Sequence, residues 1–191
     1  LDQAISVPSA SITESDLADK LLAFRQQQDG FLVPSFNPIS GSGPNGAIVH
    51  YRAIAGADRE LASDDLLLLD SGGHYRDGTT DITRTIAIGT PPNGAVAAYS
   101  HVLQSHIHLA MAKFPTGTDG KQLDAIARAP LWAAGLDFAH GTGHGVGHVL
   151  SVHEGPANIS KRGNVALEAG MVLSNEPGYY QTCDWGIRIE N

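Results

Sequence analysis

The fold class is decided by residues 66–88, which read LLLLDSGGHYRDGTTDITRTIAI. The apolar run Leu66–Asp70 is typical of a buried strand, and Gly72 with Gly73 predicts a break after it. Residues 80–88 are rich in Thr and Ile, which favour a second strand. Because these two strands are close in the chain, they can pair as an antiparallel hairpin.

Each strand of this hairpin carries a carboxylate. Asp70 ends the apolar run, where a charge is costly unless it is paired or binds a cation. Asp81 follows eleven residues later, among β-formers. In a hairpin both carboxylates can meet on one face, and a divalent cation would relieve their repulsion. The alternative, that both are turn or capping residues, stays open on spacing alone.

The segment before the hairpin predicts one helix, one loop and one short strand. Residues 14–28 have the spacing of an amphipathic helix, with Thr13 and Asp16 as its capping residues. The Gly, Pro, Asn and Ser residues of 37–46 predict a loop. Residues 47–51 predict a short strand that leaves this loop.

Two helices are expected after the hairpin. Residues 95–113 place Tyr99, Leu103 and Ile107 on one stripe, and residues 120–134 end at Gly135, with Pro130 predicting a kink or a restart. Residues 138–156 and 171–191 are expected to be strands and loops. Hairpins combined with helices predict an α+β fold, with helices packed on one face of an antiparallel sheet.

Residues 140–148, HGTGHGVGH, hold three histidines, and His153 follows. The glycines between the histidines disfavour a helix, so we expect an extended backbone that keeps several histidines on one side. Four histidines within fourteen residues favour a site over isolated structural roles. Not all four can be ligands, and His148 is expected to be the least important.

Two acidic residues near the end of the chain are further candidates. Glu176 follows the apolar run 171–173, so we expect it at a strand end. Arg188 and Glu190 alternate with two isoleucines and therefore share one strand face. Either the two form a surface ion pair of little value, or Glu190 binds a metal and Arg188 supports it from behind.

Composition bounds the class of protein. The 191 residues fit a single domain, 1–191, and the net charge of -8 argues against a nucleic-acid partner and against an anionic membrane. No apolar run approaches the length of a transmembrane helix. Cys183 is the only cysteine, which fits a reducing, cytoplasmic location.

Taken together, these segments resemble the aminopeptidase P group of the pita-bread metallopeptidases. The resemblance runs from the helix at Leu17 to Asn191. It rests on seven ordered segments: GPNGAIVHY (43–51), DSG (70–72), DGTTDITRT (77–85), HGTGHGVG (140–147), VHEGP (152–156), NEPGYY (175–180) and GIRIEN (186–191). It implies a curved antiparallel sheet with helices on its outer face.

The resemblance also implies a centre of two divalent metal ions. The implied ligands are Asp70, Asp81, His144, Glu176 and Glu190. Four carboxylates and one imidazole make an oxygen-rich site that favours Mn²⁺, with Co²⁺ or Zn²⁺ as alternatives. A water shared by the two ions would be the nucleophile.

Three further histidines are implied to lie at the substrate, namely His50, His140 and His153. They would help to stabilise the oxyanion and to protonate the departing proline nitrogen. Glu176 would accept the proton of the attacking water. The implied reaction is hydrolysis of the bond between an N-terminal residue and a following proline, with peptides that carry proline in the second position as substrates.

Other functions stay open. A prolidase or a methionine aminopeptidase would share the ligands, and a non-catalytic peptide-binding module would share the fold. We also expect the chain to be a fragment, without N-terminal domains and truncated at its C-terminus. The full-length protein is expected to form a homodimer.

Overall fold

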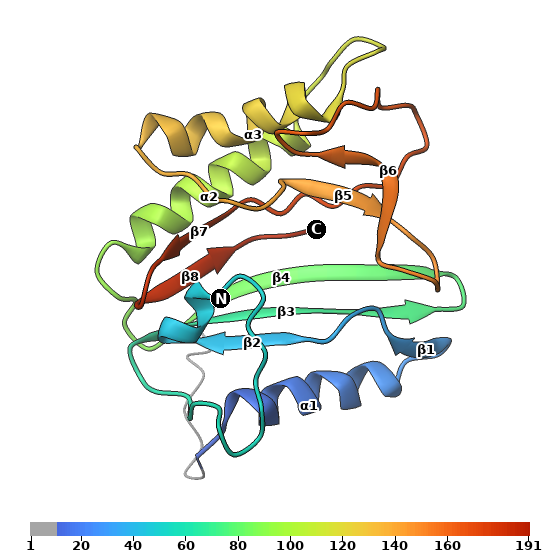
Figure 1. The fold of residues 1–191 in the computed structure, drawn as a ribbon. Coiled ribbons are helices and arrows are strands. Elements are labelled where there is room, and N and C mark those ends of the chain that lie inside the picture. The colour runs from blue at the N-terminus through green and yellow to red at the C-terminus, as the bar shows by residue number, and fades with distance from the viewer. Residues whose placement is uncertain (1–10) are drawn as a thin grey trace.

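The structure is a computed structural model that describes residues 11–191. It contains twelve elements (Figure 1): α1 Glu14–Gln26, β1 Phe31–Pro34, β2 Ile39–Ser42, the short 3-10 helix η1 Gly43–Ala47, β3 Asp65–Tyr75, β4 Gly78–Ile88, α2 Ala95–Ala110, α3 Gly120–Ala133, β5 Gly143–Val146, β6 His153–Ile159, β7 Gly178–Gln181 and β8 Trp185–Arg188. The mixture of helices and antiparallel strands confirms the α+β class.

The hairpin β3–β4 is the longest pair of strands. Its register places Asp70 opposite Thr83 and Gly72 opposite Asp81, so both carboxylates lie on one face. The predicted break after Asp70 is wrong, because β3 continues to Tyr75 with its glycines paired in the ladder. A side chain at Gly72 would overlap the backbone of Thr80, so glycine here permits close approach and does not end the strand.

The segment before β3 differs from the sequence-based prediction. The expected loop contains the buried strand β2, which pairs with β3, and the helix η1. The expected strand at 47–51 is absent: Ala47 ends η1, and the residues that follow form a bend and a turn. Pairing along Leu67–Asp70 overrides the turn preference of the Ser and Gly residues in β2, because their backbone groups are satisfied by the sheet.

Two shorter hairpins, β5–β6 and β7–β8, form the other half of the molecule (Figure 1). The two halves are joined by hydrogen bonds. Glu190 N donates to Thr83 O at 3.2 Å, and Thr85 Oγ1 donates to Arg188 O at 3.1 Å. In Figure 1, α1 lies beneath the first half, while α2 and α3 cover the outer side of the second.

Helix α1 begins where its predicted capping residues place it, and α3 begins at a cap that was not predicted. Thr13 and Asp16 form a reciprocal capping box at α1, and Asp119 forms one at α3. Helix α3 continues through Pro130 to Ala133, so of the two predicted outcomes a restart of the helix is wrong. Pro130 lies in the last turn, where losing one backbone bond costs little of the helix.

The buried face of α2 is not the predicted stripe. Ala98, Val102 and Leu109 are buried, whereas Leu103 and Ile107 are 38% and 42% exposed. Helix α3 packs directly against α2, and small side chains allow this close approach. The resulting core joins α2 to the β7–β8 hairpin through Val102, Trp185 and Ile187.

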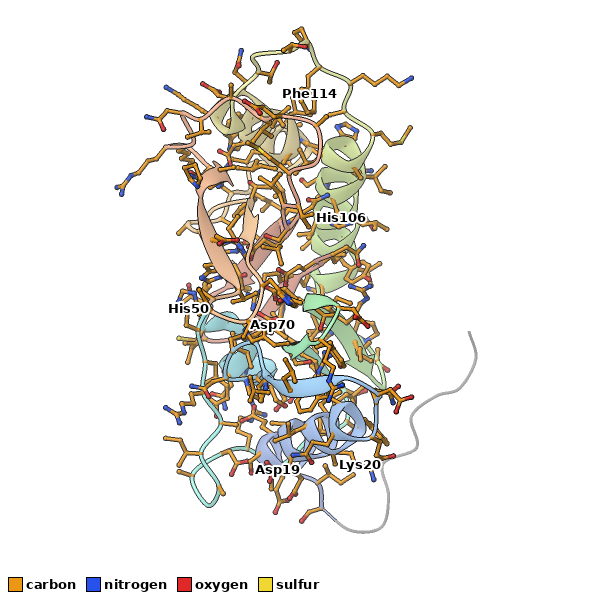
Figure 2. All side chains as sticks on the ribbon, turned by 90° about the vertical axis from the view of Figure 1, so that its right-hand side faces the viewer. Asp19, Lys20, His50, Asp70, His106 and Phe114 are labelled. Atoms are coloured by element: carbon orange, nitrogen blue, oxygen red, sulfur yellow. The ribbon has the colours of Figure 1, made fainter. Side chains whose placement is uncertain are left out.

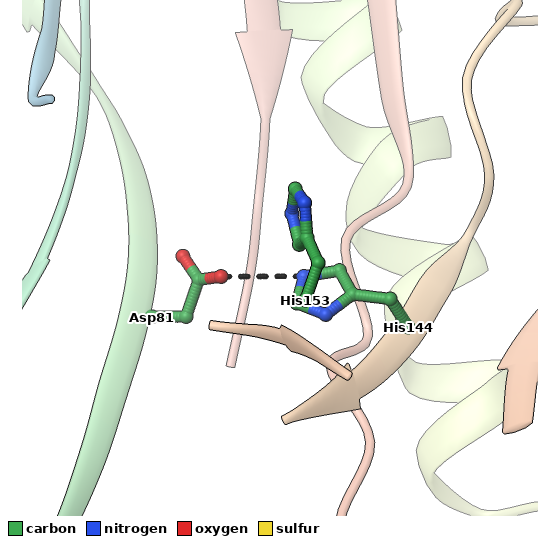
Figure 3. Close-up of side chains that lie close together, drawn as sticks. All are labelled: Asp81, His144 and His153. Atoms are coloured by element: carbon green, nitrogen blue, oxygen red, sulfur yellow. Dashed lines mark ion pairs between the residues drawn. The ribbon is translucent and has the colours of Figure 1, made fainter. Parts of the chain in front are cut away.

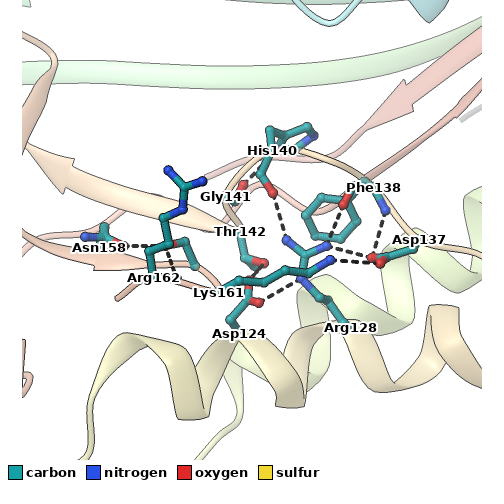
Figure 4. Close-up of polar contacts among 11 residues, drawn as sticks. Asp124, Arg128, Asp137, Phe138, His140, Gly141, Thr142, Asn158, Lys161 and Arg162 are labelled. Atoms are coloured by element: carbon teal, nitrogen blue, oxygen red, sulfur yellow. Dashed lines mark hydrogen bonds and ion pairs between the residues drawn. The ribbon is translucent and has the colours of Figure 1, made fainter. Parts of the chain in front are cut away.

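Helix α3 is fixed to the following segment by a buried arginine (Figure 4). Arg128 is 1% exposed and donates from Nε to Asp124 at 2.8 Å and from Nη1 to Asp137 at 2.6 Å. It also donates to the carbonyl oxygens of Phe138 and His140, both at 2.7 Å. The cluster therefore sets the position of the backbone that enters the histidine-rich segment.

In the part of the chain that the structure describes, no helix is long and apolar enough to cross a membrane.

Candidate metal centre

The five implied ligands come together between the two halves of the molecule. They reach it from separate segments: β3 (Asp70), β4 (Asp81), β5 (His144), the irregular segment before β7 (Glu176) and the residues just after β8 (Glu190). All five line one pocket of about 300 Å³. Three overlapping triads have candidate ligand atoms within 4.8 Å of one another: Asp70/Asp81/Glu190, His144/Glu176/Glu190 and Asp81/His144/His153.

His144 is oriented towards the carboxylates. Its Nδ1 lies 2.9 Å from the carbonyl oxygen of Gly145, and its Nε2 lies 3.2 Å from Asp81 Oδ2 and 3.4 Å from Glu176 Oε1 (Figure 3). Burial acts to lower the pKa of His144, but the hydrogen bond with Asp81 and the charge of Glu176 raise it overall. The backbone contact through Nδ1 leaves Nε2 available to a metal ion.

Two buried carboxylate oxygens lack partners. Among the described residues, Asp70 Oδ1 and Glu190 Oε1 have no hydrogen bond, although Asp70 is 7% and Glu190 1% exposed. A buried charged oxygen is unfavourable unless it accepts a hydrogen bond, pairs with an opposite charge or binds a cation. Both oxygens belong to the triad Asp70/Asp81/Glu190, so the donor set fits a bound cation.

The carboxylates also repel one another. Burial raises the pKa of Glu190 to about 9, and the charges of Glu176, Asp70 and Asp81 add to this effect. Burial likewise raises the pKa of Glu176 to about 7 and that of Asp70 above its ordinary value. This is the electrostatic pattern of a site that a divalent cation would neutralise.

The remaining oxygens of the centre are held by Arg188 and Thr83. Arg188 donates from Nη2 to Asp70 Oδ2 at 2.7 Å, and Thr83 Oγ1 donates to Glu190 Oε2 at 2.6 Å. Arg188 and Glu190 are 2% and 1% exposed, so the alternative of a surface ion pair between them is wrong. Arg188 contacts Glu190 through Thr83. Thr83 lies between them and accepts from Arg188 Nε at 3.2 Å, so the guanidinium reaches across to β3.

All three implied substrate histidines line the pocket, but their surroundings differ. His140 has a partner for each ring nitrogen: Nδ1 lies 2.7 Å from the Gly141 carbonyl, and Nε2 lies 2.8 Å from the Tyr180 hydroxyl. Tyr180 in turn accepts from Arg188 Nη1 at 2.6 Å. Burial lowers the pKa of His140 to about 4, so the ring is neutral near pH 7.

His50 and His153 are more exposed than His140. The ring of His153 packs edge-on against His144, with centroids 4.0 Å apart, and burial lowers its pKa (Figure 3). His153 also belongs to the triad with Asp81 and His144. His148 is exposed and lies outside the lining of the pocket, as expected.

Sequence reasoning missed Tyr180, Thr83 and part of the pocket wall. Tyr180 and Thr83 stand within the motifs, but nothing in their spacing assigned them a role. The missed wall residues come from the segment that was expected to be a loop and a strand, namely Phe36, Asn37, Ile39, Val49, Tyr51 and Arg52. No periodicity marks these residues, because the segment is irregular outside β2 and η1.

Comparison with known proteins identifies the family of this chain. The sequence pattern of metallopeptidase family M24 matches residues 1–191. Aminopeptidase P2 of Arabidopsis thaliana is 54% identical over 96% of this chain, and a probable Xaa-Pro aminopeptidase P of Laccaria bicolor is 53% identical over 94%. The chain spans 26% and 28% of the length of these two relatives.

Solved structures are similar over nearly the whole chain. The X-prolyl aminopeptidase of Caenorhabditis elegans, described as a cytosolic enzyme with a di-nuclear active site, has a TM-score of 0.92 and 47% identity. The match covers 97% of this chain and 30% of that one. A prolidase from Pyrococcus furiosus has a TM-score of 0.87 and 34% identity over 98% of this chain and 54% of its own. The expected pita-bread α+β fold is thereby confirmed, and the chain belongs to metallopeptidase family M24.

Proposed function

We propose that this chain forms the metal-binding catalytic domain of an Xaa-Pro aminopeptidase. The observation that carries the proposal is the convergence of four carboxylates and His144 in one pocket, with a buried oxygen of Asp70 and of Glu190 left without a partner. The relatives named as Xaa-Pro aminopeptidases share about half of its sequence, although the chain spans only about a quarter of their length.

The proposed ligands of two divalent ions are Asp70, Asp81, His144, Glu176 and Glu190. Asp81, His144 and Glu190 each belong to two of the triads. Of these three, the carboxylates Asp81 and Glu190 have the second oxygen that a residue shared between two ions would need. The oxygen-rich set favours Mn²⁺ over Zn²⁺ or Co²⁺. Two such ions would supply an acidified water as nucleophile and would stabilise the developing negative charge.

Side chains of the pocket would move the protons. Glu176 is proposed as the acceptor of the proton from the attacking water. Its Oε1 accepts a hydrogen bond from Ser174 Oγ at 3.1 Å, and Ser174 Oγ accepts one from His144 N at 3.0 Å. These contacts fix the carboxylate beside His144, which is the position that a general base needs.

The three histidines are proposed to have two different roles towards the peptide. His50 and His153, which have more solvent access, are proposed to contact the oxyanion and the departing nitrogen. His140, held between Gly141 and Tyr180, would orient the wall next to Arg188. The carboxylates would also attract the free N-terminal ammonium group, which explains a preference for the first residue of a peptide.

A prolidase is the second candidate, because prolidases share the fold at about one third identity. The test compares Xaa-Pro-Xaa peptides, the same peptides with an acetylated amine, Xaa-Pro dipeptides and Met-Ala peptides, all with Mn²⁺. Cleavage of the free tripeptide alone supports the proposal. Cleavage of the dipeptide alone supports a prolidase, cleavage after Met supports a methionine aminopeptidase, and metal binding without cleavage supports a peptide-binding module.

We propose a cytoplasmic location and a homodimer for the whole protein, as expected from the sequence. Fractionation and light scattering on that protein would test these two points.

A further inference from the structure

Glu14 is a fully buried carboxylate that is not among the residues lining the pocket. It lies in the first turn of α1, is 0% exposed and accepts six hydrogen bonds. The donors are Ser42 N at 2.6 Å, Ser42 Oγ at 3.0 Å, Asn45 Nδ2 at 3.1 and 3.0 Å to the two oxygens, Tyr51 OH at 2.7 Å and Arg59 N at 3.1 Å. Neither oxygen of Glu14 is left without a partner.

These donors belong to the segment that forms one wall of the pocket. Residues 49–52 line the pocket, and Tyr51, which bonds Glu14, directly follows His50. Asn45 Nδ2 also donates to Tyr51 OH at 2.9 Å, so the carboxylate, the amide and the phenol form one clamp. Glu14 therefore contacts a residue of the pocket wall directly, through its hydrogen bond with Tyr51.

The wall segment, residues 43–52, also packs against the other half of the molecule. Helix η1 packs against β8, and a side chain at Gly186 would overlap the carbonyl oxygen of Gly46. Gly186 lies two residues before Arg188, which holds Asp70. The wall is thus fixed on one side by α1 through Glu14 and on the other by the strand that supports the metal centre.

His50 depends on this backbone for its position. Its side chain is exposed. Figure 2 shows His50 at the surface at the level of Asp70. His50 lines the same pocket as His140 and His153.

We propose that Glu14 is a positioning residue for the reaction: it holds the wall segment 43–52 so that His50 faces the substrate. The proposal rests on the proposed function in that His50 acts on a peptide there. Glu14 touches neither substrate nor metal, so it acts only through the geometry of this segment. A displacement of a catalytic group by about 1 Å can cost about 10²-fold in rate.

The test compares wild type, Glu14→Gln, His50→Ala and the double variant. Glutamine keeps the size but turns one acceptor into a donor facing Asn45 and Tyr51. We expect faster backbone hydrogen exchange in residues 43–52, unchanged Mn²⁺ content and a fall in kcat/KM of about 10- to 100-fold. In the His50→Ala background the same change should cost less than about twofold, because coupled residues are non-additive.

Asp16→Asn is the matched control. Asp16 lies in the same turn of α1 but accepts from Thr13 N and does not contact the wall. It should lower the melting temperature without changing hydrogen exchange in 43–52 or kcat/KM. If Glu14→Gln fails to fold, Asn45→Ala, which removes two of the six bonds, is measured in its place.

The positioning role would be overturned if Glu14→Gln lowered kcat/KM equally in the wild-type and His50→Ala backgrounds. It would also be overturned if Glu14→Gln lost Mn²⁺ or left hydrogen exchange in 43–52 unchanged. If wild type cleaves no Xaa-Pro peptide, the proposed function fails instead. The exchange and metal measurements then still decide whether Glu14 holds the wall without disturbing the metal centre.

Discussion

The Arg128 cluster and the metal centre are both buried and both charged, but only the first is complete. Arg128 is matched by Asp124, Asp137 and two carbonyl oxygens, and none of the unpartnered buried atoms found among the described residues belongs to this cluster (Figure 4). The metal centre gathers four carboxylates against one guanidinium and leaves two oxygens without partners. The protein itself completes the Arg128 cluster, whereas the donor set of the metal centre fits a bound cation.

Glu14 and Glu190 show the same contrast between single residues. Both are at most 1% exposed, yet Glu14 accepts six hydrogen bonds and Glu190 accepts one side-chain bond, from Thr83. Burial alone therefore does not identify a functional acid. A buried acid whose oxygens all accept hydrogen bonds from the protein stabilises the fold. A buried acid with an unpartnered oxygen is a candidate for binding a ligand.

The largest effect is expected from the histidines of the centre. His144→Ala should lower both the metal content and the activity, the latter by at least about 10⁴-fold, since it removes a ligand as well as any help with proton transfer. His153→Ala should retain the metal and lower kcat by about 10²–10⁴-fold. Metal analysis and steady-state kinetics measure both quantities.

The control for these two variants is His148→Ala, which alters an exposed histidine of the same segment. It should change neither quantity by more than about twofold, as for ordinary surface substitutions. Equal metal loss in the His144 and His153 variants would refute the separation of roles. This outcome would instead make His153 a ligand within the triad it forms with Asp81 and His144.

Arg128→Met tests the complete cluster. Breaking a buried ion pair by removing one partner costs about 3–5 kcal/mol, because the remaining charge is uncompensated. We expect a loss of this size in the free energy of unfolding, measured by urea denaturation of the metal-free protein. A loss below about 1 kcal/mol, the value of a surface pair, would show that the cluster does not stabilise the fold.

Glu190→Gln tests the incomplete cluster. In the metal-free protein this change removes a carboxylate that other carboxylates repel, so the free energy of unfolding should fall by less than about 1 kcal/mol or rise. Metal binding should nevertheless be weakened. If the metal-free variant loses as much stability as Arg128→Met, the two clusters are alike and the contrast fails.

The smallest effect concerns Asp137 at the edge of the Arg128 cluster. Burial opposes ionisation, but hydrogen bonds from Phe138 N and Arg128 lower the pKa of Asp137 to about 2. Because the folded pKa lies below the ordinary 3.8, the stabilisation is present above pH 3.8 and is lost as the pH falls through about 2. Its size is below about 1 kcal/mol because the side chain is 41% exposed.

The Asp137→Asn variant should therefore show a slightly flatter decline of stability between pH 4 and pH 2 than wild type. Acid unfolding followed by circular dichroism measures the difference. Identical curves would show that solvent screens this carboxylate completely.

The sequence predicted the parts of the fold that local patterns control. The strand β4, the capped start of α1, the approximate bounds of α3 and the extended backbone of the histidine segment follow from propensity, capping and glycine spacing. The errors arose where tertiary contacts decide. Strand β2 forms because β3 pairs with it, and the buried face of α2 is selected by α3.

The residues of the candidate site were predicted from the seven motifs taken together. The hydrogen bonds between these residues were not predicted. The convergence of Asp70 and Asp81 follows from hairpin register, but no spacing shows that Thr83 stands between Arg188 and Glu190. The six hydrogen bonds to Glu14 likewise come from residues that are 28 to 45 positions away in the chain, and they exist only once the chain is folded. Long-range partners of buried groups cannot be read from local pattern.

The five proposed ligands, with their unpartnered carboxylate oxygens, should bind two cations. The most direct measurement is equilibrium dialysis of the metal-free protein against Mn²⁺, followed by metal analysis. We predict two Mn²⁺ ions per chain, with a rise in melting temperature because binding to the folded state adds about 2.7 kcal/mol at a hundredfold excess over Kd. Fewer than one Mn²⁺ per chain at saturation, with an unchanged melting temperature, would contradict the account.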